Sequence, residues 1–97
     1  MDHDEIKKTF ETYFEKYKKT EGDRTAWSAP FTQYKGPEQF EVNLTKCPRG
    51  DVFKPFANGK KLPEVVGWDN FLNTLPDLEK EHGVDADAFF KEMKDSL

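Results

Sequence analysis

The chain has 97 residues, of which 35% are hydrophobic and 35% are charged, and its formal net charge is −4. A chain of this length holds one thin core, so residues 1–97 are expected to form a single domain. The polar composition approaches that of disordered proteins. Disordered chains are poor in aromatic residues, however, whereas 14% of this chain is aromatic. We therefore expect a folded domain with an aromatic-rich core.

Targeting and redox features predict a cytoplasmic protein. The sequence contains no apolar run of about 18 residues, which argues against a membrane-spanning helix. Its first residues are acidic and lead directly into an amphipathic stretch, unlike a secretory signal. Cys47 is the single cysteine and cannot form an internal disulfide, which is typical of a reducing compartment.

Residues 4–21 are predicted to form an amphipathic helix. Gly22 follows as a residue that readily ends a helix, and Asp2 or Asp4 can cap its start. The apolar residues that recur at helical spacing are Ile6, Phe10, Tyr13, Phe14 and Tyr17.

With the Gly22-Asp23-Arg24 segment that follows, this aromatic helix resembles the opening helix of cystatin-like and nuclear-transport-factor-like folds. The resemblance covers residues 6–27, less than a quarter of the chain, so no family and no site residue are assigned from it.

The hydrophobic period changes from about residue 27. Residues 40–45 alternate between apolar and polar side chains, which predicts a half-buried strand. Residues 27–34 form a weaker strand pattern, joined to it by a Lys35-Gly36-Pro37-Glu38 turn. Pro48-Arg49-Gly50 ends the second strand.

Asn58-Gly59 after residues 52–57 is a strong signal for a two-residue hairpin, because both residues tolerate positive φ. In that register Pro55 faces Leu62. Proline cannot donate to a ladder, so this hairpin is expected to be short and to lie at an edge of the sheet.

The last third is predicted to be helical. Trp68, Phe71, Leu72 and Leu75 follow helical spacing, Pro76 starts or kinks a turn, and Gly83 ends the segment. Asp85 caps a final helix, with Val84 placed to pack on Phe89. The whole pattern predicts an α+β fold: an N-terminal amphipathic helix, a small antiparallel sheet of three to four strands, and two to three C-terminal helices.

No motif in the sequence indicates an enzyme. Cys47 and His82 could form a thiol–imidazole pair, but nothing around either residue supports nucleophilic catalysis. The cysteine and the two histidines lack zinc-binding spacing, and the glycines are scattered singly rather than in a phosphate-binding loop. We therefore expect no catalytic residues, no metal and no cofactor.

The basic cluster around the Asn58-Gly59 turn stands out, because Lys54, Lys60 and Lys61 are interleaved with aromatic residues there. This pattern has three interpretations: protection of an edge strand from aggregation, contact with an acidic protein surface, or contact with a nucleic-acid strand. The acidic overall balance disfavours nucleic acid, because dedicated binders are usually basic.

Charge is unevenly divided along the chain. Residues 25–63 carry a net charge of +3 and residues 64–97 a net charge of −6. The acidic part could present a surface that mimics a nucleic acid, in the manner of small acidic inhibitors. The acidic residues that could form this surface are Asp69, Asp77, Glu79, Glu81, Asp85, Asp87, Glu92 and Asp95.

The leading hypothesis is a non-catalytic protein-binding module, acting as an inhibitor or an adaptor. One thin core is not expected to cover every aromatic residue of the sheet, and aromatics left exposed beside lysines are typical interface anchors. The predicted partner-binding residues are Trp27, Phe31, Tyr34, Phe53, Lys54, Phe56, Lys60 and Lys61. Nucleic-acid binding through the basic hairpin is the alternative, followed by the acidic mimic.

Overall fold

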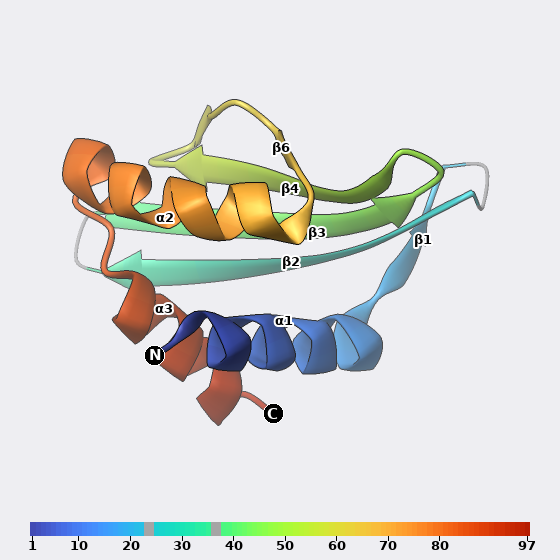
Figure 1. Ribbon diagram of the computed structural model, residues 1–97, viewed down its shortest axis with the longest axis horizontal. Coiled ribbons are helices and arrows are strands. Elements are labelled where there is room, and N and C mark those ends of the chain that lie inside the picture. Colours follow the sequence, from blue (N-terminus) through green and yellow to red (C-terminus); the bar gives the residue numbers. More distant parts are fainter. Residues whose placement is uncertain (23–24, 36–37) are drawn as a thin grey trace.

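The computed structural model describes residues 1–22, 25–35 and 38–97, and within them the side chains of residues 34, 35 and 38 are not described. Its fold is α+β, with an N-terminal helix, an antiparallel sheet and two C-terminal helices (Figure 1). The helices are α1 (His3–Tyr17), α2 (Trp68–His82) and α3 (Ala86–Asp95). The strands are β1 (Lys19–Glu21), β2 (Ala26–Lys35), β3 (Glu38–Cys47), β4 (Gly50–Ala57), β5 (Lys60–Lys61) and β6 (Val65–Val66).

The sheet has more strands than the three to four expected. Its order is β1-β2-β3-β4-β5, β6 also pairs with β4, and all these pairings are antiparallel. The two unexpected strands, β1 and β6, have three and two residues. The Lys35–Glu38 turn predicted between the first two long strands falls largely on residues 36 and 37, outside the described residues.

The first helix ends earlier than predicted. Lys18 is its C-cap with extended backbone, and the next three residues form β1 instead of a last helical turn. These residues are all exposed, so no apolar contact favours continuing the helix over pairing with β2. At the other end the prediction is confirmed, because Asp2 is the N-cap and its Oδ1 accepts from the backbone of Glu5 at 2.8 Å.

The predicted hairpin is confirmed in its register. Asn58 and Gly59 have φ of 52° and 79°, and the ladder pairs Ala57 with Lys60. Pro55 then faces Leu62, whose N–H donates to the Pro55 carbonyl at 2.9 Å. The outer strand of this hairpin is only two residues long, as the prolines predict.

There are two C-terminal helices, and they end and begin at the residues that the sequence predicts. Gly83 ends α2 in the left-handed conformation with φ of 66°, and Asp85 caps α3 by accepting from the backbone of Ala88. Pro76 lies inside α2 on its exposed side, so α2 continues past it to His82.

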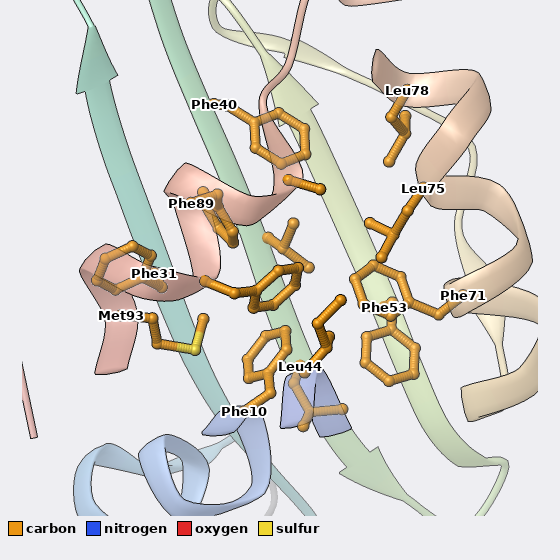
Figure 2. Packing of buried hydrophobic residues seen from close by; sticks show 14 of the residues in the cluster. Phe10, Phe31, Phe40, Leu44, Phe53, Phe71, Leu75, Leu78, Phe89 and Met93 are labelled. Atoms are coloured by element: carbon orange, nitrogen blue, oxygen red, sulfur yellow. The ribbon is translucent and has the colours of Figure 1, made fainter. Parts of the chain in front are cut away.

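All three helices lie on one face of the sheet. The residues of β2, β3 and β4 that enter the core occupy alternate positions and are cross-strand partners, as in the row Phe31, Val42 and Pro55. Figure 2 shows these side chains meeting rings from α1, α2 and α3. The opposite face, here called the outer face, has no helix over it.

The core is rich in aromatic rings, as predicted. Phe10, Phe53, Phe71, Phe89 and Phe90 are completely or almost completely buried. Phe53 and Phe71 stack at 4.1 Å with nearly parallel planes, whereas most other ring pairs meet edge to face. Tyr17, expected in the helix stripe, is 39% exposed and donates through its hydroxyl to the Ser96 carbonyl.

Both prolines within strands lie where the backbone points away from β3. The N–H and the C=O of Gln39 both form hydrogen bonds with Asn58, so the backbone polar groups of Gln39 point toward β4. In an antiparallel strand every second residue points to the same side, so those of Asn43 also point toward β4. Pro30, the partner of Asn43, therefore faces outward, where its carbonyl accepts from the Tyr13 hydroxyl. An added strand would find no N–H donor at either Pro30 or Pro55.

Candidate functional site

The structure separates the predicted partner-binding residues instead of gathering them in one place. Phe31 is 9% exposed and Phe53 is fully buried, so both belong to the core and cannot be exposed anchors. The expectation that they are left outside the core is wrong, because three helices on one face make a core large enough to hold them. The side chain of Tyr34 lies outside the described part of the structure.

Trp27 is exposed but lies apart from the lysines. It is 43% exposed, and Lys18 Nζ lies 5.6 Å from its ring centroid. Its partner on β3 is Lys46, whereas Phe56 is paired with Glu41. These two β3 partners, Lys46 and Glu41, are five positions apart, which corresponds to about 17 Å along the strand. Because the number is odd, Trp27 and Phe56 also lie on opposite faces of the sheet. The single aromatic and basic patch predicted from sequence is therefore not formed.

Three of the predicted residues do gather on the outer face. Lys54 and Phe56 alternate with core residues of β4, and Lys61 is the cross-strand partner of Phe56. Lys54 and Phe56 are half-buried and Lys61 is exposed. These three residues are called the outer-face cluster below. Lys60 is exposed at the tip of the hairpin and pairs with Ala57, so alternation directs it to the other face.

Carboxylates border the outer-face cluster. Glu41 is the β3 partner of Phe56, and its Oε1 accepts from Thr32 Oγ1 at 2.6 Å. Lys61 Nζ lies 3.6 Å from Glu64 Oε1, and that side chain also pairs with Arg49 at 3.5 Å. The lysines are thus partly balanced by neighbouring negative charge, and the cluster is mixed rather than purely basic.

The neighbouring strip of the outer face is closed to a ligand. Thr45 and Val52, a cross-strand pair, are 4% and 1% exposed although no helix covers them. Asn43 Oδ1 and Thr45 Oγ1 are buried without a hydrogen-bond partner among the described residues. The Thr45–Val52 pair therefore offers no accessible surface, although Val66, the β6 partner of Val52, is 40% exposed beside it.

A second polar arrangement lies on the helix side, at the far end of the sheet. Trp68 Nε1 donates to both Glu11 Oε1 at 3.1 Å and Asp51 Oδ2 at 3.0 Å. Lys46 Nζ pairs with Glu11 Oε2 at 2.6 Å, and both side chains are 31% exposed. The four residues come from α1, β3, β4 and α2, so this network joins the elements and satisfies its own polar groups. Sequence reasoning missed it, because its members are far apart in the chain.

The residues considered for catalysis are not brought together. Cys47 is half-buried near the end of β3, and its Sγ is 3.6 Å from the Gly50 carbonyl. His82 lines a small hollow with Gln39 and Phe40, at the other end of the same strand. Seven residues of strand separate these ends by roughly 23 Å. Within the described ranges no three His, Cys, Asp or Glu side chains cluster as metal ligands would.

None of the three helices, over the residues that the structure describes, is long and apolar enough to cross a membrane. Comparison with protein-family models, with curated proteins and with solved structures gave no match in any of the three. The functional argument therefore rests on the arrangement of this chain's own side chains.

Proposed function

We propose that this chain is a non-catalytic protein-binding module, which contacts its partner through the outer-face cluster of Lys54, Phe56 and Lys61. The observation that carries this proposal is the one-sided arrangement of the helices, which leaves one sheet face without a helix and with a half-buried aromatic ring beside two lysines. Aromatic residues ringed by polar groups are common anchors of protein interfaces.

The charges around the cluster favour a protein partner over nucleic acid. Glu41 and Glu64 lie next to the lysines and would face the phosphates of a bound strand. A protein surface can place acidic groups opposite the lysines and basic groups opposite the glutamates, whereas a phosphate backbone carries negative charge only. The prolines favour binding through the sheet face over binding at a sheet edge. Pro30 and Pro55 have no N–H to pair with an added strand, and their carbonyls already accept hydrogen bonds.

The test compares capture of a partner by wild-type protein and by matched variants. Immobilised wild-type protein, Phe56→Ala and Lys54→Glu/Lys61→Glu are each exposed to a lysate of the natural host. A protein captured by the wild type is then purified and titrated by calorimetry. We expect each cluster variant to weaken its affinity at least about tenfold, as loss of an interface anchor does. Lys80→Glu, an exposed change on α2, is the control and should leave the affinity unchanged.

Three results would contradict the proposal. Equal binding by all variants would remove the outer-face cluster as the interface. Salt-dependent binding of labelled oligonucleotides, lost in Lys60→Glu/Lys61→Glu, would instead support the nucleic-acid alternative. Loss of a captured protein only when the acidic residues of α2 and α3 are neutralised would favour the acidic mimic.

A further inference from the structure

A groove lies between α2 and the chain segment that joins β5 to β6, with a volume of about 270 Å³. Figure 1 shows this segment passing above α2. The floor is apolar and is formed by the buried side chains of Pro55, Leu62 and Leu78. Pro63 and Val65 complete the apolar wall. A typical site for a cofactor or drug-sized ligand holds about 300–1,000 Å³, so this groove suits one or two side chains of a polypeptide.

The rim of the groove is acidic. Asp77 and Glu81 are exposed, one helical turn apart on the same face of α2, and both line the groove. Within the described part of the chain neither pairs with a lysine or an arginine, and Glu81 has only His82 Nε2 at 3.9 Å. Lys61, from the nearby hairpin, pairs with Glu64, which does not line the groove. The rim therefore has negative charge available for a bound cation.

The backbone of the groove offers little to an added strand. Pro55 and Pro63 have no N–H, and the Pro55 carbonyl already accepts from Leu62. A ligand would have to be recognised by its side chains. An apolar stem with a cationic end matches an apolar floor with an acidic rim.

We propose that this groove binds an arginine side chain of a partner polypeptide, with the aliphatic stem on the Leu62–Leu78 floor and the guanidinium at Asp77 and Glu81. Arginine fits better than lysine because its planar fork can donate to two carboxylates together, whereas an ammonium is a more strongly hydrated point charge. The groove is on the helix-covered side of β4, so this proposal goes beyond the outer-face interaction and is tested independently of it.

The test uses acetyl-Leu-Arg-amide as the probe, with acetyl-Leu-norleucine-amide as the uncharged analogue of similar stem length. Amide shifts of Val65, Leu78 and His82 are followed by NMR during titration of the wild-type protein. We expect saturable, millimolar binding at these positions, at least about fivefold weaker for the norleucine probe. Binding of the arginine probe should also weaken as sodium chloride rises, while that of the norleucine probe should not.

Substitutions in α2 test whether the acidic rim of the groove is responsible for binding the arginine probe. Asp77→Asn/Glu81→Gln should weaken the affinity for the arginine probe about fivefold. Glu79→Gln is the control, because Glu79 is an exposed acidic residue of α2 that does not line the groove, and it should change the affinity less than about twofold. Shifts that do not saturate, equal affinity for the two probes, or equal loss in Glu79→Gln would each overturn the proposal. Because the wild-type comparison of probes needs no substitution, the test holds even if a variant is unstable.

Discussion

The hydroxyl of Tyr13 connects α1 to the edge of the sheet. It donates to the Pro30 carbonyl at 2.8 Å, and the ring is 9% exposed. Burial raises the pKa of Tyr13 above its ordinary value of 10.0, with a further contribution from Tyr17. The Pro30 carbonyl points away from the ladder, so this single bond completes a strand position that has no N–H of its own.

Tyr13→Phe keeps the ring and removes this hydrogen bond. We expect the free energy of unfolding, measured with urea, to fall by about 1 kcal/mol. Tyr17→Phe is the matched control: it removes the bond to the exposed Ser96 carbonyl and should cost less. Equal losses in the two variants would contradict a specific role for the Tyr13 bond.

The same substitution should alter the dependence of stability on pH. Since the pKa is raised in the folded state, the native protein keeps the phenolic proton after the unfolded chain begins to lose it near pH 10. The stability contributed by neutral Tyr13 is present below that pH and is lost as the pH rises through the folded pKa. The stability difference between wild type and Tyr13→Phe should therefore narrow above pH 10, and a constant difference would contradict this account.

Among the elements, the hairpin of β4 and β5 is fixed by its turn. Asn58 is the one residue other than glycine with positive φ in the described ranges, and its side chain accepts from the backbone of Gln39 at 2.9 Å. Its own N–H donates to the Gln39 carbonyl at 2.7 Å. The turn is thus tied to the start of β3 as well as to its own strands.

Two substitutions at Asn58 separate these effects. Asn58→Gly keeps the access to positive φ and loses only the side-chain acceptor, so we expect a loss of about 0.5–1 kcal/mol in the free energy of unfolding. Asn58→Ala adds the left-handed backbone penalty of about 1–2 kcal/mol. Urea unfolding should rank Ala below Gly; the reverse order would mean that the turn relaxes to another conformation.

Local chemistry made this hairpin predictable from the sequence. Asn58-Gly59 specifies the turn, and Asp2, Gly83 and Asp85 mark helix ends by the bonds they form or the φ they adopt. For residues 18–21 the sequence predicts helix, because their polar composition suits the exposed end of a helix as well as it suits an edge strand. Their actual state depends on pairing with β2, which is a tertiary contact that local propensity does not contain.

The candidate site was less predictable for a related reason. Lys54, Phe56 and Lys61 come together because the short hairpin was read correctly. Phe31 and Phe53 were misplaced, although each alternates with buried neighbours on its strand: Ala29 before Phe31, and Pro55 and Ala57 after Phe53. That period of two was the available signal. This pattern does not decide whether Phe31 and Phe53 are buried, because the capacity of the core depends on how many helices share one sheet face. A strand pattern contains no information on the number of helices.

At the scale of the molecule, Phe10 lies at the centre of the aromatic core. Its ring centroid lies between 5.9 and 6.5 Å from each of five others, which belong to α1, β4, α2 and α3. One side chain from α1 therefore contacts rings of the sheet and of all three helices. Figure 2 shows it beside Leu44 of β3.

Phe10→Ala should lower the free energy of unfolding by about 3–5 kcal/mol, through lost burial and the cavity left behind. That is a large part of the roughly 5–15 kcal/mol that stabilises a typical domain. Phe10→Leu, which fills most of the space, should cost clearly less. Chemical denaturation followed by far-ultraviolet circular dichroism measures both, and a loss below about 1 kcal/mol for the alanine variant would contradict a central role.

The late position of α3 has a consequence for how the chain folds as it is synthesised. The central strands, β2, β3 and β4, pair with neighbours in sequence and can form as soon as they emerge. Two of the rings that cover them, Phe89 and Phe90, belong to α3, and Phe90 lies 5.9 Å from Phe10 across eighty positions of sequence. Until α3 packs, the part of the aromatic face that it covers stays exposed even when α1 and α2 are in place, and exposed apolar surface favours chaperone binding and aggregation. The core is therefore closed only when α3 docks, however early the strands pair.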